Sequence, residues 1–323
     1  MQPSDPIPRT RPHEPVPAIV VADVHKSYGG LVAVGGLSLT VRTGEVFALL
    51  GPNGAGKTTT VEILEGHRQP DSGSVRVLGV DPWRANRRFR ERIGVVLQSG
   101  GIDGDLTVRE TIALFAGLYP RRREVDEVMT LVGLRRQARQ HVRWLSGGQL
   151  RRLDLALALV GDPEVVFLDE PTTGFDPSAR HQAWELVADL RRLGRTVLLT
   201  SHYMDEVQHL ADRVAVMSKG RIVAESTPNE LGGRDVGEAI IAFQEPYPGW
   251  QAELRSGPWM ITVTDTHEVQ ITTTKPTETL AAITSWAHDR GDELVGLTVT
   301  RPSLEDAYLH LTTVEPQPAG TEQ

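Results

Sequence analysis

The stretch GPNGAGKT, Gly51 to Thr58, decides the fold class because it matches the pattern G-x-x-x-x-G-K-[ST]. Its glycines let the backbone curl until successive N–H groups converge on one point, where a Cβ would obstruct a phosphate. The β segment GGLSLTVRTGEVFALLG (35–51) runs directly into this loop, and KTTTVEILEGHR (57–68) follows with helical spacing. The order of strand, loop and helix predicts a phosphate-binding loop, in which Lys57 reaches the β- and γ-phosphates and Thr58 ligates Mg²⁺.

Two adjacent carboxylates mark a second candidate site. The apolar run VVFL (165–168) predicts a strand that is buried on both faces, and Asp169 and Glu170 follow where that strand leaves the sheet. Open α/β sheets bind ligands at this edge. Asp169 therefore suits a magnesium shell, and Glu170 suits a group that orients an attacking water or accepts its proton. A solvated acidic turn is the alternative for these residues if they stand alone.

Three further residues have a functional and an ordinary interpretation. His202 ends the strand pattern TVLLTS (196–201), where an imidazole can reach a γ-phosphate, although a lone histidine is often a surface residue. Gln98 closes the strand pattern IGVVLQ and fits a polar strand end equally well. Tyr28 fits either a core aromatic or a platform for an adenine ring.

The segment LSGGQLRRLDLALAL (145–159) predicts a helix that begins with a serine and two glycines. Ser146 fits an N-cap, whose side-chain oxygen accepts from the first helical turn. That role does not explain Gly147 and Gly148, which weaken a helix start. A helix N-terminus with small residues in front is also a seat for phosphate, so the chain carries a second candidate phosphate site.

The order of patterns predicts an α/β core with two additions. Residues 1–17 are rich in proline and predict a disordered tail, and 18–232 alternate strands and helices, with a helical subdomain at about 100–162. A composition shift then introduces a small α+β domain at 236–313, which includes a helix in SLEDAYLHLT, before a loose tail at 314–323.

Composition excludes several classes of function. The 323 residues contain no cysteine, which excludes disulfides, thiolate catalysis and zinc–thiolate sites. The net charge of −8 argues against nucleic acid as a partner. The apolar runs are too short to span a bilayer and no signal-peptide pattern begins the chain, so we expect a cytoplasmic protein that reaches a membrane only through a partner.

Together these motifs resemble the nucleotide-binding subunit of an ATP-binding cassette (ABC) transporter, over residues 18 to about 230. The resemblance implies a P-loop NTPase cassette, which is a RecA-like α/β core with a helical subdomain, and ATP hydrolysis with Mg²⁺. It assigns catalysis to Glu170 and His202, and metal contacts to Thr58, Gln98 and Asp169. It assigns nucleotide contacts to Tyr28, Gly51, Pro52, Asn53, Gly54, Ala55, Gly56, Lys57, Thr58, Thr59, Gln98, Ser146, Gly147, Gly148, Gln149 and Asp176.

The resemblance also implies partners. Two copies would form a head-to-tail dimer, in which the signature (Leu145 to Gln149) of one chain completes the site of the other, and the helical insertion would dock on an integral membrane permease at the cytoplasmic face of the membrane. The segments LSGGQLRRLDLALAL, TTGFDP and RPSLEDAYLHLT look like the daunorubicin/doxorubicin-resistance type of exporter, with Phe175 where many relatives have Leu. An import subunit and a soluble ABC ATPase that acts on ribosomes or DNA are the alternatives. A GTPase switch is disfavoured because the chain lacks an N-K-x-D motif.

Overall fold

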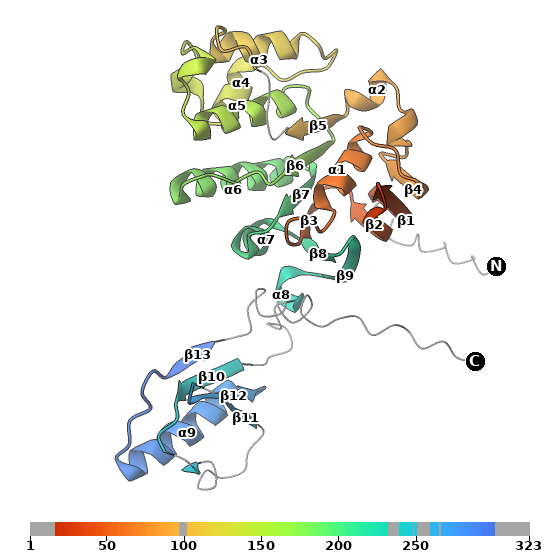
Figure 1. Ribbon diagram of the computed structural model, residues 1–323. Coiled ribbons are helices and arrows are strands. Elements are labelled where there is room, and N and C mark those ends of the chain that lie inside the picture. The colour runs from red at the N-terminus through yellow and green to blue at the C-terminus, as the bar shows by residue number, and fades with distance from the viewer. Residues whose placement is uncertain are drawn as a thin grey trace, which may run out of the picture.

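A six-stranded sheet organises the first part of the molecule (Figure 1). The computed structural model describes residues 17–96, 102–231, 239–247, 249–250, 259–264 and 266–300. The strand order is β5-β6-β7-β3-β8-β9. All neighbouring strands are parallel except β9, which runs antiparallel to β8. These strands are β3 (Val46–Leu50), β5 (Ile93–Val96), β6 (Val165–Asp169), β7 (Thr196–Ser201), β8 (Arg213–Ser218) and β9 (Arg221–Ser226).

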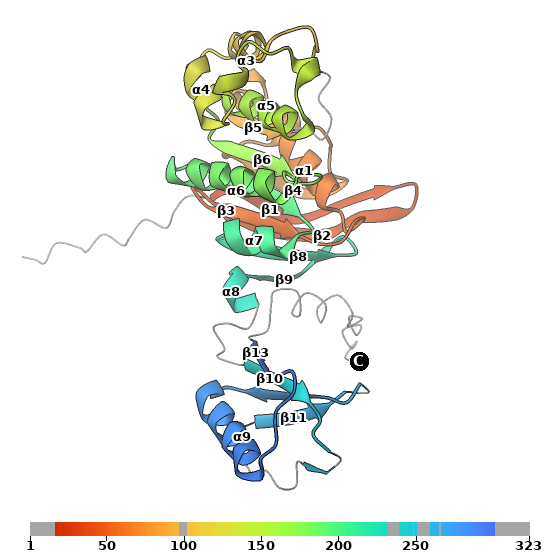
Figure 2. The same ribbon diagram turned by 90° about the vertical axis from the view of Figure 1, so that its left-hand side faces the viewer.

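The residues of the sheet alternate between two cores. One core joins Ala48, Leu168 and Leu199 to the helices on one face, and the other joins Phe47, Phe167 and Leu198 to the opposite face. Strands that are buried on both faces carry long apolar runs, which explains why β3 and β6 contain almost no polar residue. Helices α6 (Pro177–Arg192), α7 (Met204–Leu210) and the short α8 (Pro228–Leu231) follow strands of this sheet (Figure 2).

A second, antiparallel sheet covers the other face together with α1 (Lys57–Glu65). Its strand order is β2-β1-β4, formed by β1 (Pro17–Tyr28), β2 (Leu31–Arg42) and β4 (Ser72–Val77). The predicted β segment that leads into the phosphate loop, residues 35–51, contributes to two strands, β2 and β3, which lie in different sheets. Gly44 adopts a φ of +80° between β2 and β3, which redirects the chain from the antiparallel sheet into the parallel one.

Helices of the insertion pack at the β5–β6 end of the large sheet (Figure 1). They are α3 (Val108–Ala116), α4 (Val125–Leu131) and α5 (Gly147–Leu159). Buried residues on all three join the same core as β6, among them Ile112, Met129 and Leu153. Shorter helical turns are η1 (Pro82–Arg84), α2 (Arg87–Arg90), η2 (Arg135–Gln137) and η3 (Val142–Trp144).

The C-terminal part forms a separate sheet with its own core. Its four antiparallel strands follow the order β11-β12-β10-β13, and α9 (Pro276–Arg290) packs on them. Phe243, Trp250 and Ile283 are fully or almost fully buried there. The strands are β10 (Ala239–Gln244), β11 (Trp259–Val263), β12 (Glu268–Thr273) and β13 (Thr298–Thr300).

The architecture confirms the predicted fold class, an α/β core with a helical subdomain and a small α+β addition. The first strand begins at Pro17, the last residue of the predicted N-terminal tail. The rest of that tail, the predicted helix in SLEDAYLHLT and the C-terminal tail lie outside the described residues. Within the described residues, none of the helices combines the length and the apolar character that crossing a membrane requires.

Candidate active site

The phosphate loop connects the end of β3 to the start of α1. Gly56, the N-cap of α1, has a φ of +100°, and a Cβ at this position would lie 2.2 Å from the carbonyl oxygen of Ala33. Only glycine fits such a position. The amides of Lys57, Thr58 and Thr59 open α1, where the first N–H groups have no intrahelical acceptor. The loop thus presents free donors at a positive helix end, which suits an anion.

The side chain of Lys57 lies over this loop. Its Nζ donates to the carbonyl oxygens of Gly51 and Pro52 at 2.7 and 3.1 Å. It also lies 3.8 Å from Oε1 of Glu170. Burial lowers the pKa of Lys57, while the charges of Glu170 and Asp169 oppose that shift. Lys57 therefore links the loop to the two carboxylates that end β6.

Asp169 joins three elements through its carboxylate. Thr58 on α1 donates to Oδ2 at 3.2 Å, and the hydroxyl of Thr200 on β7 donates to Oδ1. Asp169 is 8% exposed, and its position beside Thr200 follows from the parallel pairing of β6 with β7. A hydroxyl and a carboxylate oxygen therefore meet at the start of α1, and oxygen ligands of this kind are the ones that Mg²⁺ prefers.

Glu170 occupies a constrained turn directly after β6. Its φ of +47° is uncommon for a residue with a side chain. Its backbone N–H donates to Oγ1 of Thr200 at 3.0 Å, and its Oε2 accepts from the hydroxyl of Thr173 at 3.1 Å. Nδ1 of His202 lies 3.3 Å from Oε1, although that nitrogen makes no hydrogen bond of good geometry. The structure therefore brings Lys57, Glu170 and His202 together.

The signature does not join this cluster. Ser146 and Gln149 instead form a reciprocal capping box, with Ser146 N–H donating to Oε1 of Gln149 at 3.0 Å and Gln149 N–H donating to Oγ of Ser146 at 3.3 Å. Ser146 and Gly147 are exposed, and a Cβ on Gly147 would meet no atom within 4 Å. The N-cap interpretation of Ser146 is correct. The N-terminus of α5 is nevertheless open to a ligand from outside the chain.

Three other candidate residues have separate environments. Asp176 caps α6, since its Oδ1 accepts from Ala179 N–H at 2.8 Å. The ring of Tyr28, 37% exposed, lies between two cations, Arg68 at 5.2 Å and Lys26 at 5.7 Å from its centroid. Tyr28 is therefore an accessible aromatic surface rather than a core residue. Gln98 lies outside the described residues.

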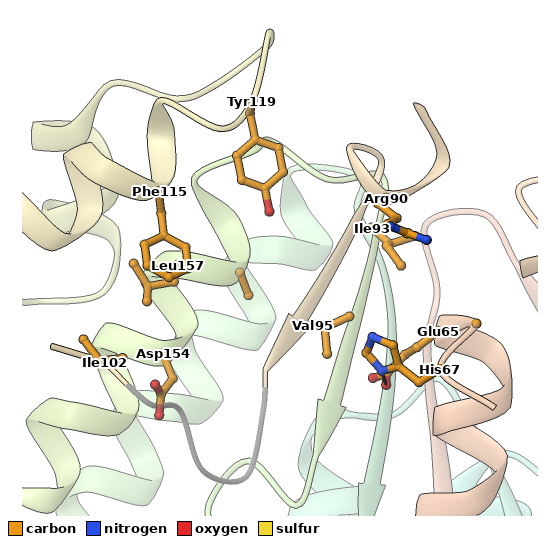
Figure 3. Close-up of a pocket in the computed structure, with 12 residues that line it drawn as sticks. Glu65, His67, Arg90, Ile93, Val95, Ile102, Phe115, Tyr119, Asp154 and Leu157 are labelled. Atoms are coloured by element: carbon orange, nitrogen blue, oxygen red, sulfur yellow. Dashed lines mark hydrogen bonds and ion pairs between the residues drawn. The ribbon is translucent and has the colours of Figure 1, made fainter. Parts of the chain in front are cut away.

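A cleft of about 570 Å³ separates α1 and β5 from the insertion (Figure 3). Its wall includes apolar side chains on both sides, such as Val95 and Phe115. Two carboxyl groups also line it. Burial, together with the charges of Asp169 and Glu62, raises the pKa of Glu65 to about 8, and burial raises the pKa of Asp154 to about 6.

Two side chains that hold the turn after β6 were not among the residues predicted from the sequence. Thr200 bonds both to Asp169 and to the backbone of Glu170, and Arg151 of α5 donates from Nη2 to the carbonyl oxygen of Asp169 at 3.0 Å. The sequence contains a weak indication of a role for Thr200, because this polar residue lies near the end of an apolar strand, two residues before His202. The sequence contains no indication of a role for Arg151, because its contact depends on how α5 packs against β6.

Comparison with known proteins identifies the family. Residues 34–173 match the family model described as ABC transporter, and residues 251–303 match the C-terminal domain of ABC transporter domain-containing protein-like sequences. The Nod factor export ATP-binding protein I of Sinorhizobium fredii is 41% identical over 308 residues, which cover 91% of this chain and 86% of that protein. The chain belongs to the ABC transporter ATP-binding proteins.

This ABC ATPase has relatives over nearly its whole length. The daunorubicin resistance ATP-binding protein DrrA3 of Streptomyces coeruleorubidus is 38% identical over 302 residues, which cover 91% of this chain and 96% of that protein. Among solved structures, cbiO1 of Clostridium perfringens, part of the ABC transporter complex cbiONQ, aligns with a TM-score of 0.60 and 28% identity. That match covers 68% of this chain and 92% of the other. The protein is the ATP-binding subunit of a transporter, and its reaction is ATP hydrolysis.

Proposed function

We propose that Lys57, Thr58, Asp169, Glu170 and His202 carry out ATP hydrolysis, and that this reaction drives export through a separate membrane subunit. The observation that supports this proposal most strongly is the meeting of these residues at the carboxyl ends of three adjacent strands, β6, β7 and β3. In an open α/β sheet this edge binds ligands. The group combines a buried cation, an anion-binding loop and a carboxylate that is held in place by its backbone.

ATP binding follows from the phosphate loop. The free amides of Lys57, Thr58 and Thr59 and the ammonium of Lys57 are donors for the β- and γ-phosphates. The remaining loop residues, Gly51, Pro52, Asn53, Gly54, Ala55 and Gly56, bring the backbone close to the phosphates. The exposed ring of Tyr28 offers a surface for stacking of the adenine.

Thr58 and Asp169 are the residues that would hold Mg²⁺, since their side-chain oxygens already approach within 3.2 Å. When bound, the ion neutralises charge on the phosphate oxygens. Gln98 belongs to the same proposed set. Thr200 keeps the Asp169 carboxylate in position through its own hydrogen bond.

Hydrolysis requires a water in line with the bond that breaks. Glu170 accepts a hydrogen bond from this water and takes its proton as the water attacks the γ-phosphorus. The bond from that phosphorus to the oxygen that bridges it to the β-phosphate breaks, and ADP is the leaving group. Lys57 neutralises charge on the transferred group. His202, whose Nδ1 lies 3.3 Å from the Glu170 carboxylate, holds that water and the γ-phosphate in position.

A head-to-tail homodimer would complete each site. The exposed N-terminus of α5, with Ser146, Gly147, Gly148 and Gln149, presents amides and a hydroxyl that no residue of the phosphate loop contacts within the described part of the chain. A second copy can bring this end of the helix to the γ-phosphate, and Asp176 would lie at the same interface. ATP would then favour the closed dimer by its higher affinity for that state.

The membrane permease would dock on the insertion, at the cytoplasmic face of the membrane. The cleft between α1 and α3 supports this proposal, because it combines apolar walls with the carboxyl groups of Glu65 and Asp154. A helix of the permease with apolar residues and one cation fits that chemistry. Export of drugs or lipophilic compounds is supported by relatives whose names state daunorubicin resistance and Nod factor export.

Replacing Glu170 with Gln tests the proposal. We expect the purified wild-type chain to release phosphate from ATP in the presence of Mg²⁺, and Glu170→Gln to lose at least 99% of this rate, on the order of a general-base contribution. The variant should bind ATP and elute as a dimer in gel filtration with ATP. Retained turnover would exclude Glu170 as the catalytic base, and a monomer with bound ATP would exclude the dimer.

A further inference from the structure

The peptide group between Asp169 and Glu170 is held at both of its polar atoms. Nη2 of Arg151 donates to its carbonyl oxygen at 3.0 Å, and its N–H donates to Oγ1 of Thr200 at 3.0 Å. The two partners come from different elements, since Arg151 lies on α5 and Thr200 on β7. The orientation of this peptide plane is therefore fixed from two sides.

This peptide group sets the direction of the Glu170 side chain. The φ of +47° at Glu170 belongs to the left-handed region, which is unfavourable for an L-residue and persists only where the surroundings impose it. Here the bonds to Arg151 and Thr200 hold the peptide group that immediately precedes this φ. If the bond from Arg151 is lost, the peptide plane can rotate, and the carboxylate leaves the position beside Lys57 and His202.

Arg151 is itself firmly placed. Its side chain is 12% exposed, and its Nη1 lies 4.0 Å from Oδ2 of Asp154, one turn further along α5. Together with Gly147, Glu170 and Thr173, it lines a second cavity of about 440 Å³ between α5 and the turn after β6. The guanidinium thus spans the boundary between the insertion and the parallel sheet.

We infer that Arg151 is a positioning residue that couples the signature helix to the catalytic turn of the same chain. This inference rests on the proposed function, in which the N-terminus of α5 engages the ATP held by the partner. Arg151 lies only five positions after Ser146, or about 7.5 Å along the helix. A shift of the helix end toward the partner's γ-phosphate therefore moves the guanidinium and the carbonyl that it holds. ATP at one site would thereby align Glu170 in the other.

The test compares Arg151→Met and Arg151→Lys with wild type. Met keeps the apolar stem and removes the donors, whereas Lys retains a cationic N–H donor group for a carbonyl that needs only one hydrogen bond. We expect Arg151→Met to lower kcat at least tenfold with KM for ATP within about twofold, and to reduce the Hill coefficient for ATP toward 1. Arg151→Lys should recover part of kcat. Arg109→Met is the control, since Arg109 pairs with Asp126 within the insertion, and it should keep wild-type kinetics.

A second measurement separates positioning from folding. In the Glu170→Gln background, Arg151→Met should still form the dimer with ATP, with an unfolding midpoint close to that of Glu170→Gln alone. Wild-type kcat in Arg151→Met would overturn the inference. Loss of dimerisation or of folding in parallel with kcat, or no recovery in Arg151→Lys, would overturn it as well. If Glu170→Gln alone stays monomeric with ATP, the proposed dimer fails, while the separation of kcat from KM still tests whether Arg151 positions Glu170.

Discussion

The hydroxyl of Thr58 donates to Oδ2 of Asp169 at 3.2 Å, although 111 residues separate them in the chain. This contact joins the start of α1 to the end of β6, so the loop and the acidic strand end form one site. Both side chains offer oxygen to a hard cation. Their separation in sequence means that only the parallel sheet brings them together.

Thr58→Val should weaken the use of Mg²⁺ more than the binding of nucleotide. Valine keeps the branched shape and removes the proposed metal ligand. We expect the Mg²⁺ concentration at half-maximal ATPase rate to rise about tenfold, since loss of one ligand or its support costs on the order of 10–100-fold in metal affinity. Thr60→Val is a matched control, because the Thr60 hydroxyl bonds to the Gly56 carbonyl instead. An unchanged Mg²⁺ profile in Thr58→Val would contradict the assignment.

Thr200→Val should reduce both stability and turnover. The substitution removes the donor to Asp169 and the acceptor for Glu170 N–H, and Thr200 is fully buried. Buried groups that lose their partners cost about 1–3 kcal/mol, which urea denaturation can measure. kcat should fall because the catalytic turn loses one of its two supports. Thr200→Ser keeps the hydroxyl and should stay near wild type in both measurements; equal damage from Ser and Val would rule out the hydrogen bonds as the cause.

Ser146→Arg should abolish hydrolysis while a single chain still binds ATP. The substitution places a bulky cation at the positive end of α5, where it blocks the approach of the signature to a partner's phosphates. It also removes an N-cap worth about 1 kcal/mol. Thr107→Ala removes an equivalent capping box from α3 and should retain activity. Isothermal titration calorimetry measures ATP binding to the Ser146→Arg monomer. Loss of that binding would contradict the proposal that the signature contacts only the ATP held by the partner.

Glu65→Gln should change how stability depends on pH. Burial raises the folded-state pKa of Glu65 from 4.5 to about 8, so the folded chain holds a proton that the unfolded chain releases above pH 4.5. The contribution of Glu65 to the free energy of unfolding is therefore fully present below pH 4.5 and is lost as the pH rises through about 8. Relative to wild type, Glu65→Gln should therefore gain stability between pH 5 and pH 8.5, on the order of a few kcal/mol. Thermal unfolding at both pH values measures the difference, and an equal difference in stability between the two chains at pH 5 and pH 8.5 would contradict this prediction.

The fold class could be predicted because the motif residues stand at the ends of apolar strands. In parallel sheets those ends share one edge, so a loop after β3, carboxylates after β6 and a histidine after β7 imply a common site. That β2 and β3 belong to different sheets could not be predicted. The sequence shows glycine breaks in this β pattern, but it does not state which sheet the chain enters after a turn.

The supports of the catalytic turn escaped prediction for a related reason. The bond between Thr200 and Asp169 depends on the register of β6 against β7, and the bond from Arg151 depends on the orientation of α5. Neither distance is encoded in local spacing. Residues that belong to a sequence motif can be found in a single sequence. Residues that position those motifs, such as Thr200 and Arg151, can be found only once the packing of the elements is known.

The strand order has a geometric consequence for the site. β7 lies between β3, which leads into the phosphate loop, and β6, which leads into Glu170. Two interstrand spacings of about 4.8 Å therefore set the gap between the proposed phosphate-binding loop and the proposed catalytic base. β7 is the strand that holds β3 and β6 apart, and all six of its residues are buried. Because backbone hydrogen bonds set this spacing, a change of side-chain size at Leu198, which points into the core on one face, would disturb packing and leave the distance between the two strand ends unchanged.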